Sequence, residues 1–172
     1  MKTIRLFIIA LIFTVSGLAH GAENQSLSLQ DQENIQQMTQ EMSALGISEV
    51  QAEKMLMSMH QNRFQRQNMV RAQQAVMAAA KEGLPTEPIM NKAMEGMVKK
   101  AEEQQVISAM EAVRSRHEYA YRTARSFANN KKSVEIMAKA IADSAAAGMP
   151  VQDMDRIAAQ LQSQTRQQTR NQ

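Results

Sequence analysis

Residues 106–127 read VISAMEAVRSRHEYAYRTARSF, and small or apolar side chains recur in this stretch at alternating spacings of four and three. The side chains that follow this rule are Val106, Met110, Val113, His117, Ala120, Ala124 and Phe127. A seven-residue repeat of this kind lines one face of a helix that packs against another helix. The stretch therefore predicts a long helix in an all-α protein, and Asn129-Asn130 predicts its end.

The composition supports the all-α class. The chain of 172 residues is 44% hydrophobic but only 3% aromatic, and it contains 15 Met. Met, Ala, Gln, Glu, Lys and Arg lose little rotamer freedom in a helix, whereas the β-branched and aromatic residues that strands prefer are scarce here. Three Pro and six Gly are too few for a fold of many short strands. We therefore expect no β-sandwich, barrel or doubly wound sheet.

Helix-start signals and apolar stripes predict about five to six helices. Ser28 begins a first helix that ends before Gly46, and Ser48 begins one long helix over about 49–81. The middle of this long helix, residues 60–68, is polar, so it either crosses solvent or bends. Besides the helix of residues 106–127, three further helices are expected to begin near Thr86, Ser133 and Pro150.

The last two predicted helices carry apolar stripes that we expect to be buried. These stripes are Val134, Met137, Ile141 and Ala145 in one helix and Met154, Ile157 and Leu161 in the other. Their spacings of three and four place them on one face of each helix.

Three predicted helix junctions resemble one another. Gly46-Ile47-Ser48, Gly83-Leu84-Pro85 and Gly148-Met149-Pro150 each place a helix-ending Gly before an apolar residue and a new helix start. Ordinary capping chemistry explains such a likeness. The other interpretation is a degenerate helical-repeat array, in which each unit needs its neighbour to bury an apolar face. The architecture is therefore expected to be either antiparallel helical hairpins or such an array.

The first 21 residues have the order of a secretory signal peptide. Lys2 and Arg5 precede an apolar run over residues 6–15, and small residues follow up to Gly21. An uncleaved membrane anchor is the alternative, but the run is shorter than the roughly 20 apolar residues that span a bilayer. We expect residues 1–21 to be removed and the protein to be exported, to the periplasm or the extracellular space.

The rest of the sequence predicts one domain. Residues 22–163 carry all the helix signals, and this length suits one compact domain or an extended helical array. Residues 164–172 contain only Gln, Thr, Arg and Asn. We expect this polar tail to fray, because it has no apolar side chain with which to dock.

Charge and motifs argue against several classes of function. Loss of Lys2 and Arg5 with the leader lowers the formal charge from +3 to +1, which fits nucleic acid poorly. The absence of Cys excludes disulfides, a thiol nucleophile and a Cys-ligated metal. The sequence has no glycine-rich phosphate loop, nucleophile elbow, paired-histidine zinc motif or acidic calcium loop. We expect no enzymatic activity, no cofactor and no nucleic-acid partner.

Met55, Met59 and His60 are the candidate metal ligands. Thioether sulfur and imidazole bind Cu(I), and Met55 and Met59 share a helix face. Met57 points about 200° away from both, so one helix cannot turn all three Met inward. The alternative is that Met fills gaps between packed helices, or lines a soft surface for apolar ligands.

The stretch 114–125 holds the main basic and aromatic concentration. Arg114, Glu118, Tyr121 and Arg125 fall on one side of the predicted helix, where they are candidates for binding an acidic partner or anionic lipid headgroups. The alternative is a solvated face with local ion pairs. His117 lies in the heptad seam and is expected to be a packed core or interface histidine.

These features together predict an exported, non-enzymatic helical binding or scaffold protein that engages a protein partner through a Met-lined groove or a helix seam. In composition the chain resembles the small periplasmic stress chaperones of helical-hairpin type, which implies a chaperone-like role. Their Leu-Thr-x-x-Gln signature is absent. A soft-metal protein using Met55, Met59 and His60 is one alternative, and a structural module that oligomerises through residues 106–127 is another.

Overall fold

The computed structural model describes residues 28–170, except for the side chains of residues 161–162 and 164–170, so the expected signal peptide lies outside it. The described chain contains helices and no strand, which confirms the all-α class. It contains seven helices rather than the expected five to six. They are α1 (Leu29–Ser43), α2 (Glu49–Gln61), α3 (Arg66–Lys81), α4 (Glu87–Val98), α5 (Glu103–Arg125), α6 (Lys131–Ala146) and α7 (Val151–Arg170).

The single long helix expected over about 49–81 is wrong, because a turn separates α2 from α3. Arg63 adopts a left-handed conformation with φ of 60°, which ends α2. The Arg63 N–H donates to the His60 carbonyl at 2.8 Å, and the Phe64 N–H donates to the Met59 carbonyl at 3.0 Å. This is a Schellman cap, in which the apolar residue beyond the turn packs back on the core. Phe64 is accordingly 8% exposed.

The structure also differs from the expected boundary at residue 163. Helix α7 continues to Arg170, through most of the tail that the sequence led us to expect as frayed. Gln and Arg are good helix formers, so this segment can extend a helix without apolar contacts.

The helices repeat with a period that favours the helical-repeat interpretation. Helices α1, α3 and α5 begin at Leu29, Arg66 and Glu103, so each start lies 37 residues after the previous one. The turns keep the same interval, with left-handed residues at Gly46 and Gly83 and again at Arg63 and Lys100. Buried positions also correspond: Ile35 with Ala72, Thr39 with Val76, and Met42 with Ala79.

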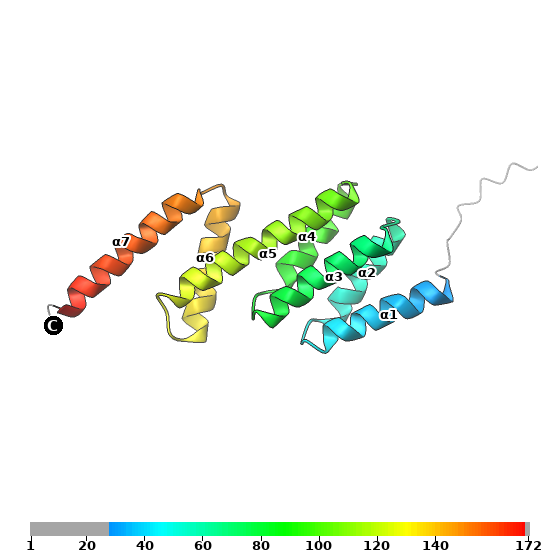
Figure 1. Ribbon diagram of the computed structural model, residues 1–172, viewed down its shortest axis with the longest axis horizontal. Helices are drawn as coiled ribbons and strands as arrows, with labels where there is room; N and C mark the ends of the chain where they lie inside the picture. Colours follow the sequence, from blue (N-terminus) through cyan, green and yellow to red (C-terminus); the bar gives the residue numbers. More distant parts are fainter. Residues whose placement is uncertain (1–27, 171–172) are drawn as a thin grey trace, which may run out of the picture.

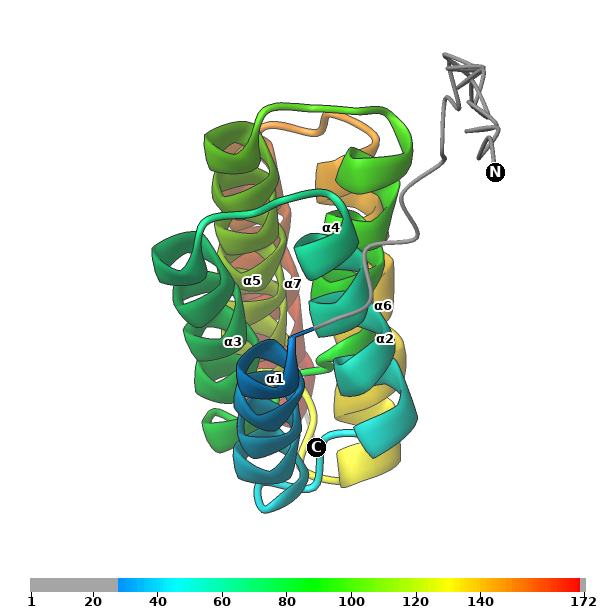
Figure 2. The same cartoon turned by 90° about the vertical axis from the view of Figure 1, so that its right-hand side faces the viewer.

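The repeated unit is a helical hairpin, and the hairpins stack side by side into an elongated array (Figure 1). Seen along the array, α1, α3, α5 and α7 form one layer, and α2, α4 and α6 form the other (Figure 2). Each unit buries its apolar face against the next, as in other helical solenoids. No helix within residues 28–170 is both long enough and apolar enough to cross a membrane.

The core has a large part and a small part. The main core runs through α1 to α4 and the first half of α5, and it includes Met42, Met55, Leu56, Met59 and Met110. The small core lies between the second half of α5 and α6. It consists of four alanines, Ala120, Ala124, Ala138 and Ala142. Small side chains let two helices approach closely but bury little apolar area.

Helix α5 belongs to both cores, as its seven-residue repeat predicted. Val106, Met110, Val113, Ala120 and Ala124 are buried, and the two remaining repeat positions are half-buried. At its start α5 lies so close to α4 that a Cβ on Gly96 would be 2.7 Å from the Val106 Cγ2 atom. Helix α5 therefore packs against both α4 and α6 and connects the two cores.

Candidate binding grooves

Two grooves flank α6. The first, which we name the charged groove, lies between α4 and α6, has α5 as its floor and has a volume of about 610 Å³. The second, which we name the apolar groove, lies between α6 and α7 beside the end of α5 and has a volume of about 280 Å³. Opposite faces of α6 line the two grooves. They are therefore separate surfaces that share no lining residue.

The charged groove exists because α5 is longer than the helices mounted on it. Helix α4 packs on the first half of α5, and α6 packs on the second half. Helices α2 and α4 pack side by side, but α4 and α6 are not in comparable contact. Four residues from the middle of α5, namely Val113, Arg116, His117 and Tyr121, therefore form the floor between the two walls.

Charges of both signs line this groove. Its charged residues are Lys92 and Glu95 from α4, Arg116 from α5, and Glu135, Lys139 and Asp143 from α6. His117 and Tyr121 add polar atoms from the floor, and Pro85, Pro88, Ala142 and Ala146 add apolar surface. The formal positive and negative charges in the groove are equal in number. The charge of ligand that the groove prefers therefore depends on which of its side chains are already paired.

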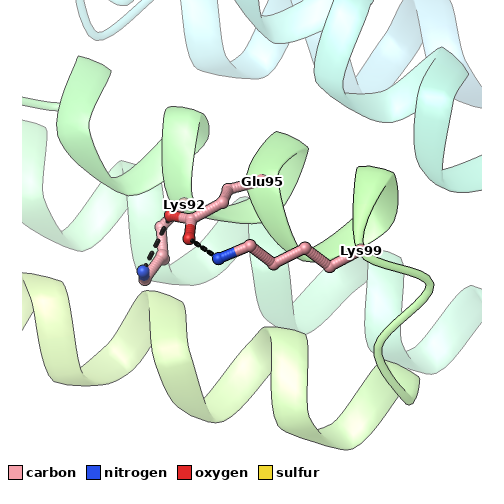
Figure 3. A network of polar contacts seen from close by, with 3 residues as sticks. All are labelled: Lys92, Glu95 and Lys99. Carbon is pink, nitrogen blue, oxygen red and sulfur yellow. Dashed lines mark hydrogen bonds and ion pairs between the residues drawn. The ribbon is translucent and has the colours of Figure 1, made fainter.

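The acidic residues of the groove all have a cationic neighbour. Glu95 accepts from Lys92 at 2.8 Å and also from Lys99 (Figure 3). The hydrogen bond from Lys92, which has the larger effect, and the one from Lys99 together lower the pKa of Glu95 from 4.5 to about 2. Asp143 lies 2.6 Å from Lys139, and Glu135 lies 3.9 Å from the Lys131 ammonium. Each of these carboxylates therefore already has a lysine partner.

Arg116 is left without such a neighbour. Its side chain is half-buried in the groove, and within the described part of the chain it has neither a carboxylate nor a hydrogen-bond partner. A guanidinium is always charged at neutral pH and presents a planar fork of donors. Arg116 is therefore the uncompensated cation of the charged groove. In the sequence Arg116 is only one of several arginines in this helix.

His117 lies beside Arg116 in the groove floor. Its Nδ1 atom is buried, with no hydrogen-bond partner among the described residues. Burial lowers the pKa of His117, the Arg116 charge lowers it further, and Asp143 opposes both effects. The imidazole is thus held neutral. The proton is better placed on Nε2, because an N–H at Nδ1 would be buried without an acceptor. The expected seam position is correct, but the side chain is only half-buried.

The predicted partner-binding residues serve mainly to hold α5 against the end of α3. The Arg114 Nη1 atom is 2.9 Å from the Glu82 carboxylate and 4.0 Å from that of Glu118. Arg125 donates to the Glu82 carbonyl at 3.4 Å, and its guanidinium lies 5.7 Å from the centre of the Tyr121 ring. Of the four predicted residues, Tyr121 is the one that lines the charged groove.

The predicted metal ligands are not brought into an open site. Met55 and Met59 are 0% exposed and pack in the main core, on the shared face that their spacing predicted. His60 is half-buried at the end of α2. Among the described residues, no group of three or more His, Asp or Glu side chains is arranged to hold a metal ion. Met57, on the other side of α2, is partly buried against the main core.

The apolar groove contains residues that the sequence predicted as buried. Ile157 is 48% exposed, and Met137 and Ile141 are half-buried. Helix α6 instead buries its alanine face against α5. Helix α7 diverges from α6 (Figure 1), and a hydrogen bond from the Tyr119 hydroxyl to Asp155 at 2.6 Å ties it to α5. The prediction of burial is correct for Met154, which is 7% exposed. It is wrong for Ile157 and only partly met by Met137 and Ile141, because no following helix in the described chain covers them. The Leu161 side chain lies outside the described residues.

The Met-rich lining of the apolar groove is its chief chemical feature. Met137, Met149 and Met154 meet there with Phe127 and Ile141. Unbranched thioether side chains adjust to differently shaped apolar ligands. Together the two grooves offer apolar burial on one side of α6 and charge pairing on the other, which are the contacts that a bound polypeptide uses.

Comparison with protein-family models, curated proteins and solved structures finds no match to this chain.

Proposed function

We propose that this protein is an exported, non-enzymatic helical-repeat protein that binds an amphipathic helix of a partner protein in the apolar groove. The observation that carries the proposal is the open, Met-lined surface between α6 and α7 in a chain whose other apolar stripes are largely buried. Partners of this kind include scaffold components and unfolding clients, so a chaperone-like role falls within the proposal.

The repeat supports a helix as the occupant. Helices α1, α3 and α5 are each followed by a second helix that completes a hairpin. Helix α7 is the last helix of the described chain, and it makes only sparse contacts with the others. A partner helix laid against Ile157 would cover the groove that Met137, Met149 and Met154 line. Binding of an amphipathic helix through anchors at helical spacing is a common mode of recognition.

Substitution at the mouth of the groove tests the proposal. In Ile157→Lys a charge replaces an apolar side chain that is 48% exposed, so the fold is expected to tolerate the change. Fully burying an Ile side chain contributes about 1.5–3 kcal/mol, and about half of Ile157 remains to be buried, so we expect affinity for a fluorescein-labelled amphipathic helical peptide to fall about 3- to 10-fold. Fluorescence anisotropy with the full chain measures this.

Ile136→Lys is the matched control. Ile136 is on α6, is 64% exposed and lines neither groove. It should leave peptide affinity and protection of an aggregating client unchanged, whereas Ile157→Lys should weaken both. Equal effects of the two variants would refute the proposal.

Light scattering over a dilution series tests whether a second copy of the chain occupies the groove instead. A dimer that Ile157→Lys converts to a monomer would assign the groove to that second copy.

A further inference from the structure

We propose that the charged groove between α4 and α6 is a second binding site, which takes a peptide carboxylate on the Arg116 guanidinium. This site is separate from the apolar groove and does not depend on the function proposed for it. It is reached from the opposite face of α6.

The charge balance of the groove points to a carboxylate. Glu95, Glu135 and Asp143 have lysine neighbours, and Lys92 and Lys139 are neutralised in those pairs. Arg116 retains an unpaired charge in a half-buried position. A guanidinium binds a carboxylate through two parallel hydrogen bonds, and the bonds strengthen where protein replaces part of the water. A ligand that supplies one carboxylate satisfies the site.

The neighbouring His117 favours the same ligand. Its neutral form presents the Nε2 proton as a donor, because Nδ1 is sealed without a partner among the described residues. The groups that act on this imidazole are Arg116 from its own helix and Asp143 from α6. The groove also carries Lys92 and Glu95 from α4, and Glu135 and Lys139 from α6. A carboxylate on Arg116 neutralises the charge that opposes His117 protonation, so ligand binding should raise the pKa of His117.

The walls of the groove favour a peptide over a phosphate or a lipid headgroup. Because the three wall carboxylates are paired with lysines, Arg116 leaves one positive charge to balance, which a carboxylate matches and a doubly charged phosphate exceeds. The same carboxylates can accept hydrogen bonds from peptide N–H groups. Pro85, Pro88, Val113 and Ala142 offer apolar surface for the side chains that flank the anchoring carboxylate. An extended segment with an acidic side chain or a free C-terminus matches this lining.

Four fluorescein-labelled octapeptides of one parent sequence test the site and distinguish the two sources of carboxylate. They carry either Glu or Gln at one central position and end in either a free carboxylate or an amide. We expect the full chain to bind at least one carboxylate-bearing peptide more tightly than the amidated Gln peptide. Arg116→Gln should lower that affinity about 10- to 100-fold, since a hydrogen-bonded charge pair is lost. Arg116→Lys should recover part of it, because lysine restores the charge without the fork.

Arg122→Gln is the matched control. Arg122 is exposed on the same helix, lies over the Tyr119 ring and lines neither groove, so its loss should leave affinity unchanged. Ile157→Lys should also leave it unchanged, which separates this site from the apolar groove. Circular dichroism melting checks that Arg116→Gln is folded. NMR titration of His117 gives an independent readout, with its pKa rising when the peptide binds.

Two results would overturn the proposal. If Arg116→Gln and wild type bind the acidic peptides equally, Arg116 is not the anchor. If inorganic phosphate competes at lower concentration than acetate, the site prefers phosphate and the peptide assignment is wrong.

Discussion

Arg114 and Arg116 are two residues apart on α5, but they have different roles. Arg114 meets the Glu82 carboxylate at the end of α3, whereas Arg116 lines the charged groove with no carboxylate partner among the described residues. In the sequence both are arginines in a helix rich in charged residues. Helix periodicity places them about 200° apart, but only the positions of α3, α4 and α6 around α5 decide which of them meets a carboxylate. The sequence therefore indicated the basic helix but not the residue whose charge is unpaired.

His117 gives a prediction about pH. Burial and Arg116 lower its pKa below 6.5 in the folded protein, so the unfolded chain binds more protons at mildly acidic pH. The contribution of His117 to stability is therefore complete above pH 6.5 and declines as the pH falls from there toward the lowered pKa. We expect urea midpoints measured between pH 7.5 and 5 to decline less steeply in His117→Gln than in wild type.

Arg116→Gln checks the cause of this pH effect. Removing the Arg116 charge should move the pKa of His117 back toward its usual value without eliminating the part caused by burial. NMR titration of the His117 ring measures this change. A pKa at or above 6.5 in wild type, or identical pH slopes for wild type and His117→Gln, would show that the imidazole is solvated rather than sealed in the groove floor.

At the scale of elements, the sequence identified the turns that use Gly and the break between α4 and α5, but it missed the Arg63 turn, which does not use Gly. Gly46, Gly83 and Gly148 all have positive φ, as their position at the end of a helix predicted. Arg63 and Lys100 take the same conformation without Gly, at 60° and 54°. A search for helix-ending Gly cannot find them, which is why α2 and α3 were predicted as one helix. The deciding signal is Phe64, whose burial stabilises the turn from outside the helix.

Arg63→Gly tests this account of the turn. The left-handed conformation costs a non-Gly residue about 1–2 kcal/mol, and the extra freedom of Gly in the unfolded chain offsets roughly half of that gain. We expect Arg63→Gly to stabilise the protein by about 0.5–1 kcal/mol in urea unfolding. Gln61→Gly, two residues earlier within α2, should instead destabilise it by about 0.5–1 kcal/mol. Destabilisation by both variants would mean that the Arg63 side chain contributes contacts that outweigh the strain.

At the scale of the whole molecule, the two ends of the array are built differently. Met and Leu side chains fill the main core between α1 and α5, whereas α6 is held to α5 by an alanine face and α7 has sparse contacts. The sequence predicted the apolar stripes of α6 and α7 from their spacing. It could not predict that Ile157 stays open while Met154 is buried, because burial depends on which helix covers each position.

This asymmetry predicts a gradient of local stability along the array. In a linear array each unit is stabilised mainly by its neighbours, so a weakly packed end opens without unfolding the rest. We expect amides of α3 and α4 to exchange most slowly with deuterium. The protection factors of α7 amides should be at least about 100-fold lower than those of α3 and α4, a difference of about 2.7 kcal/mol in opening free energy. Hydrogen exchange followed by mass spectrometry resolves these segments. Adding the amphipathic helical peptide should slow exchange in α7 of wild type and not of Ile157→Lys, because the peptide supplies the missing neighbour. Uniform protection from α1 to α7 in the free protein would show instead that α7 is already covered, and would remove the open groove on which the proposed function depends.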